Sequence, residues 1–276
     1  MDLKVVEYEV GERVAVVRLN RPERLNTWTG RMHVEYRWAL AQAEQDPSVR
    51  VISVTGAGRG FCAGAEPRAL EGHVAKGGYD PGTPNVMENP GYGVRPEYDH
   101  NFAFQFGMTK PIIAAINGPA AGVGLAIACY ADLRFAAEGA KLTTAHGKLG
   151  LPAEYGLSWI LPRLIGVTRA NDLLLSSRVV LAEEAATMGL VNAVVPAEQL
   201  WEHTMRYARQ LADGVSPASL RETKRQIYAD LHGDVGSSVR ESERLLDVMM
   251  READYREGVA AFVEKRAPNF MDRAER

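Results

Sequence analysis

The chain has 276 residues, 46% of them hydrophobic, which is enough to bury a full core in one large domain or in a domain with an appendage. A formal net charge of −3 without a run of basic residues argues against a nucleic-acid partner. No stretch approaches the roughly 18 consecutive apolar residues of a membrane span, and the N-terminus lacks the pattern of a signal peptide. We therefore expect a cytoplasmic protein that binds neither nucleic acid nor membranes.

The first half of the chain predicts alternating strands and helices. Residues 3–19 form two strands by their apolar pattern, with a turn at Gly11. A helix is predicted over 29–45, capped by Thr29 and stopped by Asp46 and Pro47. Further strands are predicted over 49–55, 112–116, 133–136, 141–143 and 191–195. Further helices are predicted before Lys110 and over 125–131 and 181–188, and Gly189 ends the last of them.

Beyond residue 200 the pattern predicts helices only. Ser216 and Pro217 are a cap and a first helical residue for a helix that continues to about 231, and two more helices are predicted over 239–250 and 255–265. This change predicts a core over 1–200 and a helical region over 201–276. Apolar residues of the tail either pack on a neighbouring subunit or belong to the core of the chain itself; they are Leu245, Leu246, Val248, Met249 and Met250.

Two glycine-rich turns carry most of the functional information. They cover residues 58–66 and 117–125, and each follows a β-branched apolar run and leads into a predicted helix. Such turns leave unpaired N–H groups at the start of the helix, where negative charge is stabilised. Two turns of this kind are able to direct two backbone donors at one oxygen, which is an oxyanion hole.

The cysteines and the acidic residues indicate no metal chemistry. Cys62 and Cys129 are the two cysteines, and two small, buried, reduced thiols suit a cytosolic chain better than a disulfide between them. No His, Cys, Asp and Glu cluster has the spacing of metal ligands, so we expect no metal.

Several motifs in register resemble the enoyl-CoA hydratase/isomerase (crotonase) superfamily. They are Asn20-Arg21-Pro22, Gly60-Phe61-Cys62-Ala63-Gly64-Ala65-Glu66, residues 110–118, Ala131-Asp132-Leu133-Arg134, residues 150–163 and Phe262-Val263-Glu264-Lys265-Arg266. The resemblance implies an α/β fold, a crotonase-like spiral of ββα units with a C-terminal helical trimerisation region. It also implies a homotrimer or a hexamer built from two trimers. The expected substrate is an acyl-CoA thioester, and no separate cofactor is expected.

The resemblance also implies roles for individual residues. The two oxyanion donors are the backbone N–H groups of Ala65 and Val123, and Val123 replaces a glycine that is common at its position. The expected CoA-binding residues, some around the CoA and some near its adenine end, are Arg24, Leu25, Ala63, Glu66 and Gly122. Arg24 is equally well explained as an ordinary exposed arginine.

The expected acid and base residues depart from those of a hydratase of this family. Such enzymes typically use two glutamates, and the matching positions here hold Ala126 and His146. Because alanine cannot accept a proton, we do not expect two-carboxylate hydration. Glu154 remains as the candidate base for moving a proton next to the thioester, and its alternative role is a charge at a helix start or in a surface ion pair. His146 is either an acid or base or a hydrogen-bonded structural histidine.

Three functions follow from these motifs. The first is an acyl-CoA enzyme of hydratase/isomerase type. The alternatives are a carbon–carbon bond hydrolase of β-diketone type and a catalytically silent CoA-binding paralogue. A long loop is predicted over 72–97 from its glycines and prolines, and its tyrosines either line an acyl pocket or pack on the surface; they are Tyr79, Tyr92 and Tyr98. Tyr155 and Trp159 are further residues that either shape the acyl end or serve packing.

Overall fold

The computed structural model describes residues 1–77 and 98–270. Its main sheet has six strands in the order β1-β2-β3-β4-β6-β9, and a smaller sheet has the order β5-β7-β8. In the main sheet β1 and β2 are antiparallel and every other neighbouring pair is parallel. The strands are β1 (Val6–Gly11), β2 (Val14–Leu19), β3 (Val51–Gly56), β4 (Ile112–Ile116), β5 (Ala120–Ala121), β6 (Leu133–Ala137), β7 (Lys141–Thr143), β8 (Val180–Leu181) and β9 (Ala193–Val195).

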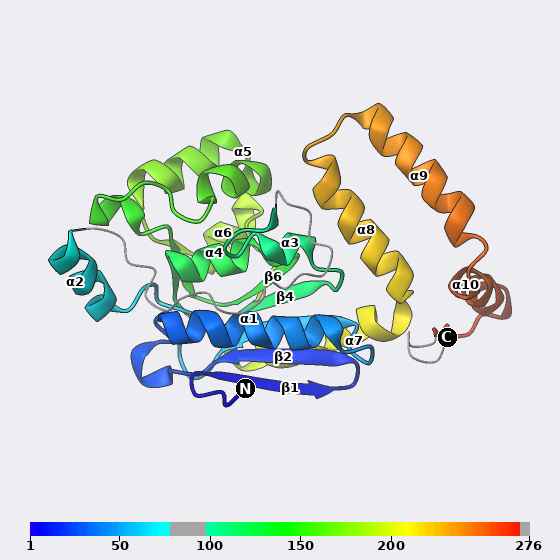
Figure 1. The fold of residues 1–276 in the computed structure, drawn as a ribbon, viewed down its shortest axis with the longest axis horizontal. Helices are drawn as coiled ribbons and strands as arrows, with labels where there is room; N and C mark the ends of the chain where they lie inside the picture. The colour runs from blue at the N-terminus through cyan, green and yellow to red at the C-terminus, as the bar shows by residue number, and fades with distance from the viewer. Residues whose placement is uncertain (78–97, 271–276) are drawn as a thin grey trace.

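Both faces of the main sheet are covered, so every residue of β3 and β4 is buried. Alternate residues of β2 point to opposite faces of the sheet. Ala15 and Val17 belong to the larger core cluster, together with residues of helix α1 (Gly30–Gln45). Val14 and Val16 belong to the smaller cluster, together with residues of helix α7 (Leu200–Gly214). Figure 1 shows α1 running along the strands.

The larger core cluster is completed by helices of the middle third of the chain. The most buried is α4 (Val123–Cys129), in which every residue is buried. α5 (Leu157–Ser176) contains Pro162 and has a non-helical backbone at Gly166. The remaining elements are η1 (Pro22–Arg24), α2 (Pro67–Lys76), α3 (Phe104–Gly107), η3 (His146–Leu149), α6 (Ala182–Met188) and η4 (Ala197–Gln199).

The last three helices project from the core on one side of the molecule (Figure 1). They are α8 (Pro217–Asp230), α9 (Val235–Met249) and α10 (Ala253–Glu264). α8 is attached to the core by Asp132, whose carboxylate accepts hydrogen bonds from Lys224 Nζ at 2.8 Å and from Tyr228 Oη at 2.7 Å. Exposed apolar side chains of this region include Leu246, Val248, Met250, Tyr255, Val259, Phe262 and Val263.

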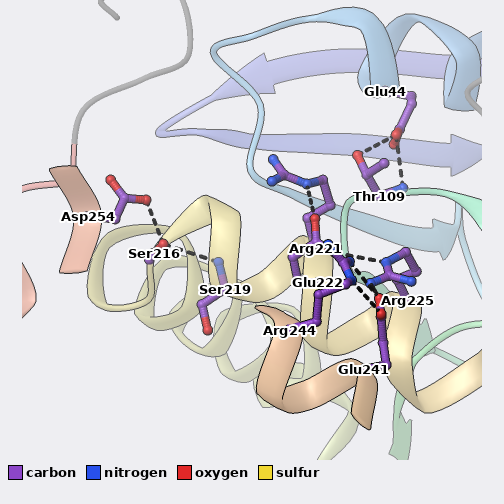
Figure 2. A network of polar contacts seen from close by, with 10 residues as sticks. All are labelled: Glu44, Thr109, Ser216, Ser219, Arg221, Glu222, Arg225, Glu241, Arg244 and Asp254. Atoms are coloured by element: carbon purple, nitrogen blue, oxygen red, sulfur yellow. Dashed lines mark hydrogen bonds and ion pairs between the residues drawn. The ribbon is translucent and has the colours of Figure 1, made fainter. Parts of the chain in front are cut away.

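A polar network joins the C-terminal helices to one another (Figure 2). Arg225 of α8 bonds Glu241 of α9 at 2.5 Å and Glu222 of its own helix at 2.8 Å. The Ser216 hydroxyl caps α8 by accepting from Ser219 N, and it donates to Asp254 of α10 at 2.6 Å. These contacts give α8, α9 and α10 a defined arrangement although they cover little of the core.

Most predicted elements are confirmed, including the caps at Thr29, Ser216 and Gly189. The predicted loop over 72–97 is wrong for residues 72–76, which continue α2; one glycine in a helix costs only about 1 kcal/mol and does not end it. Tyr79 and Tyr92 lie outside the described residues.

α4 begins at Val123, earlier than predicted, and α5 was not predicted. The predicted division of the chain at residue 200 stays a prediction. α7, which begins at that residue, packs on the main sheet.

Both cysteines are free and buried, as expected. Of the five apolar residues of the tail, Leu245 is buried within the chain, Met249 is half-buried, and Leu246, Val248 and Met250 are exposed.

Candidate active site

The two glycine-rich turns lie side by side. Cys62 N donates to Pro119 O at 3.0 Å, and Ala121 N donates to Cys62 O at 3.0 Å. Glycine is required where the turns touch: a Cβ on Gly124 would lie 2.1 Å from Cys62 O, and a Cβ on Gly118 would lie 2.1 Å from Arg59 O. The glycines of the second turn therefore allow its backbone to approach the first.

The N–H group of Ala65 points away from Trp28. Gly64 O accepts a hydrogen bond from Trp28 N at 2.7 Å. The C=O and N–H groups of a trans peptide point in opposite directions, and the described peptides are all trans. Ala65 N–H, in the same peptide as Gly64 O, is therefore directed away from Trp28. The second turn lies close to this peptide, since a Cβ on Gly64 would be 3.4 Å from Ala121 O.

The N–H group of Val123 is unpaired for a different reason. Val123 is the first residue of α4, so no carbonyl of its own helix is available to its N–H. Its neighbour Gly122 has a φ of 50° and donates instead to Thr143 O at 3.0 Å. Within the described ranges, neither Ala65 N nor Val123 N donates a hydrogen bond to another residue. Two adjacent backbone segments thus each present one unused donor.

His146 and Glu154 lie on the loop that follows β7. β7 pairs with β5, which brings the start of this loop beside Gly122. The His146 side chain is only 5% exposed, and its Nδ1 atom is buried with no partner in the described part of the chain. Glu154 is half-buried; burial raises the pKa of its carboxyl group, and the positive charge of His146 opposes that rise. The His146 and Glu154 side chains are therefore close enough for their charges to interact.

Ala126 lies one helical turn after Val123 and is fully buried. Its methyl group offers neither a donor nor an acceptor. Glu154 lies not on α4 but on the loop that follows β7, and that loop begins beside Gly122 of the second turn.

Three comparisons agree on the family. The sequence model described as "Enoyl-CoA hydratase/isomerase" matches residues 9–273. The chain is 39% identical over 277 residues to the Mycobacterium tuberculosis protein named "Probable enoyl-CoA hydratase EchA12", covering 99% of this chain and 94% of that protein. It is 37% identical over 265 residues to the 1,2-epoxyphenylacetyl-CoA isomerase of Escherichia coli K12, covering 95% and 96%. The chain belongs to the enoyl-CoA hydratase/isomerase family.

A solved structure supports the same assignment for the fold. The enoyl-CoA hydratase of Bacillus anthracis superposes with a TM-score of 0.81 at 29% identity, covering 97% of this chain and 99% of that one. The mixed α/β fold is therefore that of the crotonase superfamily, as the motifs predicted. Family membership also makes the chain an enzyme of hydratase/isomerase type that acts on acyl-CoA. No helix in the described ranges has the length and apolarity that crossing a membrane requires.

Four of the five residues that the family resemblance assigns to CoA lie on two touching segments, and the fifth, Gly122, lies on the second glycine turn. Arg24 is exposed at the end of η1, and Leu25 is half-buried with its carbonyl accepting from Ala63 N at 3.0 Å. Glu66 Oε2 accepts from Arg21 Nη1 at 2.8 Å and from Thr27 Oγ1 at 2.9 Å. The bond from Arg21 holds the pKa of Glu66 below its usual value. Glu66 is thus an ionised residue that joins the first glycine turn to residues 21–27.

A group of aromatic side chains, which the sequence did not single out as a group, joins the first turn to the loop of Glu154. We call Trp28, Phe102 and Tyr155 the aromatic wall. The ring centroids are 5.5 Å apart for Trp28 and Phe102 and 5.1 Å apart for Phe102 and Tyr155, both edge-to-face. Trp28 pairs with Ala65, and Tyr155 follows Glu154 directly. Of these three residues, the sequence analysis named only Tyr155. Trp28 and Phe102 were missed because the sequence carries no local signal for contacts between distant rings.

His33 packs on the aromatic wall and does not share the chemistry of His146. Its ring lies 6.1 Å from Trp28 and 5.8 Å from Phe102, centroid to centroid. Burial, helped by the charge of Arg37, lowers the pKa of His33 to about 4. His33 is therefore neutral near pH 7 and adds no charge to the site.

Proposed function

We propose that this enzyme moves a double bond within an acyl-CoA thioester by transferring one proton. The thioester carbonyl oxygen binds between the N–H groups of Ala65 and Val123, and Glu154 transfers the proton. The proposal is supported by the pair of unused backbone donors on two touching segments, together with a half-buried carboxyl group whose pKa is raised. His146 modifies the base through its charge.

The proposed reaction needs only one proton-carrying group. Glu154 removes a proton from carbon 2 of a 3-enoyl-CoA, and the electron pair delocalises onto the carbonyl oxygen as a dienolate. The two N–H groups stabilise that negative oxygen more than they stabilise the neutral carbonyl, which is what accelerates a reaction. Glu154 then returns the proton to carbon 4, so the double bond moves from carbons 3–4 to carbons 2–3. No water is consumed, and a second carboxylate at the position of Ala126 is not needed.

The same binding mode assigns the CoA moiety to the first turn. We propose that Ala63, Glu66 and Gly122 line the path of the pantetheine chain and that Arg24 and Leu25 contact the adenine end. The exposed guanidinium of Arg24 is suited to a phosphate. Glu66 acts here through its bonds to Arg21 and Thr27, which hold the turn in place.

The direct test is to supply 3-hexenoyl-CoA and follow formation of the conjugated 2-enoyl thioester by its ultraviolet absorbance. We expect isomerisation, and we expect little hydration of crotonyl-CoA by the same sample. Rapid hydration of crotonyl-CoA without isomerisation would overturn the proposal. Binding of free CoA should be detectable by calorimetry; its absence would favour the β-diketone hydrolase. Binding without turnover of any enoyl-CoA would favour a silent paralogue.

The pH dependence of isomerisation follows from the environment of Glu154. Only the ionised carboxylate accepts a proton, so kcat should fall as the pH falls through the pKa of Glu154. Burial raises that pKa, so the fall should be centred above 4.5, the ordinary value for glutamate. The charge of His146 lowers the pKa of Glu154. In His146→Gln the fall of kcat on the acid side of the profile (the acidic limb) should therefore move to higher pH. Initial rates measured between pH 4 and pH 9, roughly the span in which carboxyl and imidazole groups titrate, give this limb for both proteins.

An unchanged limb in His146→Gln would exclude an electrostatic role for His146. A limb at 4.5 or below in the wild-type enzyme would contradict the assignment of Glu154 as the base.

We propose further that α8, α9 and α10 bind other copies of the chain, giving a homotrimer or a hexamer. Phe262 on α10 is 85% exposed and lies among other exposed apolar residues on the projecting helices. Phe262→Asp should lower the molar mass measured by light scattering to that of a monomer. Val74→Asp is the matched control, because Val74 is 82% exposed on α2, away from these helices, and should not change the mass (Figure 1). A monomeric wild-type enzyme would contradict the proposal.

A further inference from the structure

A cavity of about 430 Å³ lies next to the loop of Glu154, within the size range of small-molecule pockets. Residues from four segments line it: the 98–106 segment, the end of α4, the start of α5 and the end of α8. Most of the lining residues carry rings; they are Tyr98, His100, Phe106, Tyr130, Tyr155, Trp159 and His232. We call it the Trp159 cavity. Neither the proposed oxyanion hole nor Glu154 indicates which part of a substrate this cavity binds.

The floor of the Trp159 cavity is apolar although it contains two tyrosines. Tyr98, Phe106 and Tyr130 are all buried. The Tyr130 hydroxyl donates to Tyr155 O at 2.8 Å, and the Tyr98 hydroxyl donates to Tyr228 O. Each phenol hydrogen is therefore committed to a backbone carbonyl, and the rings present their carbon surfaces. Phe106 and Tyr130 meet edge-to-face with their centroids 5.0 Å apart.

The rim of the cavity is polar and partly aromatic. Trp159 is half-buried and stacks on His232, with ring centroids 5.5 Å apart and planes 18° apart. The Arg163 guanidinium lies 3.9 Å from the centroid of the Trp159 ring. His100 and His232 are exposed at the opening. The arginine and histidine contacts hold the Trp159 ring in place at the rim of the cavity.

The cavity adjoins the short piece of backbone that carries Glu154. Tyr155 and Gly156 line the cavity and follow Glu154 directly. Gly156 has a φ of 72°, and a Cβ there would lie 2.5 Å from Tyr130 Oη, so this backbone touches Tyr130. Tyr130 caps the end of α4, and Val123 is its first residue. Seven helical residues span about 10 Å, so the cavity wall at Tyr130 lies about that far along α4 from Val123.

We propose that the Trp159 cavity binds an aromatic ring at the far end of the acyl group, so that the substrates are aryl-substituted acyl-CoA thioesters. This inference rests on the proposed function, because it assumes that the thioester carbonyl lies at Ala65 and Val123. An aryl ring gains edge-to-face and stacked contacts with Phe106, Tyr130 and Trp159 in addition to burying its apolar surface. A straight alkyl chain gains only the burial.

Binding of two thioesters with equal numbers of acyl carbons tests the inference without relying on turnover. 6-Phenylhexanoyl-CoA and dodecanoyl-CoA each have twelve acyl carbons and no double bond to move, so calorimetry measures binding alone. The five methylene groups of 6-phenylhexanoyl-CoA carry its ring far enough from the carbonyl to reach the cavity. Dodecanoyl-CoA exposes more apolar surface, so apolar burial by itself favours dodecanoyl-CoA. We expect the opposite order, with 6-phenylhexanoyl-CoA binding about tenfold more tightly, as one or two aromatic contacts provide. Equal or tighter binding of dodecanoyl-CoA would overturn the inference.

Trp159→Leu removes the ring from the rim and keeps an apolar side chain. It should remove most of the preference for 6-phenylhexanoyl-CoA and leave binding of dodecanoyl-CoA within about twofold, because alkyl burial does not depend on ring geometry. Trp201→Leu is the matched control: Trp201 is also a half-buried tryptophan covered by an arginine, Arg18 at 5.6 Å, but it packs on the opposite face of the main sheet. It should change neither affinity.

The outcomes separate the inference from the proposed function. A preference that survives Trp159→Leu, or that Trp201→Leu removes equally, would overturn the inference. If both thioesters bind alike while 3-hexenoyl-CoA is isomerised, the aryl specificity fails and the proposed function stands. If no CoA thioester binds, both fail.

Discussion

Glu154→Gln is expected to lower the rate of isomerisation by about 10²–10⁴-fold, the usual contribution of a general base. A carboxamide has nearly the size of a carboxylate but cannot accept the proton from carbon 2. The Glu154 side chain makes no hydrogen bond or ion pair with another residue that the structure describes, so the substitution breaks no contact of the fold. The rate should be measured in single turnovers with 3-hexenoyl-CoA, so that product release does not mask the proton-transfer step.

Two controls make the result specific. Thermal unfolding should be nearly unchanged in Glu154→Gln, and calorimetry should give an affinity for octanoyl-CoA close to that of the wild type. Glu154→Asp retains a carboxylate at a shorter reach and should keep more activity than Glu154→Gln. The assignment fails if Glu154→Gln keeps more than about a tenth of the wild-type rate, since a base contributes at least about 10²-fold.

Val123→Pro is expected to lower the isomerisation rate by about 10²–10³-fold through the loss of one oxyanion donor. Proline has no N–H group, yet it is tolerated at the first position of a helix, where that N–H has no partner within the helix. Val123 is the first residue of α4, and its N–H donates no bond within the described ranges. The substitution thus removes the proposed catalytic donor without removing a hydrogen bond of the fold. Steady-state kinetics with 3-hexenoyl-CoA measures the effect.

Val123→Ala is the control for this experiment. Alanine also shortens the buried side chain, but it keeps the N–H group, so its rate should stay far closer to that of the wild type. The melting temperatures of the two variants show whether either loses its fold. A Val123→Pro enzyme that folds and isomerises its substrate as fast as Val123→Ala would show that this N–H does not stabilise the enolate.

The two experiments address different parts of the same reaction. Glu154→Gln removes the group that carries the proton, and Val123→Pro weakens stabilisation of the charge that appears on oxygen when the proton leaves. If both groups act on one dienolate, their effects should not add, because groups that act as a unit in catalysis are non-additive.

Local features of this chain were predictable from its residues alone. The caps at Thr29, Ser216 and Gly189 depend on a hydroxyl or a glycine acting within a few residues, and the sequence displays both directly. The glycine turns were visible for the same reason. α5 was missed because Pro162 and Gly166 resemble breaks in the pattern; Pro162 lies within a helix, whereas Gly166 is a genuine kink between two helical stretches. Burial of its apolar side chains stabilises α5 despite this local conflict.

The geometry of the site depended on contacts between residues distant in the sequence. The backbone direction at Ala65 is set by Trp28, and its proximity to the second turn is set by pairing between Cys62 and Ala120. The environment of Glu154 and the aromatic wall likewise join elements far apart along the chain. Periodicity and spacing report only on neighbours along the chain. The sequence therefore determined which groups are available for chemistry, and the packing of the sheets and helices alone decided which of them meet.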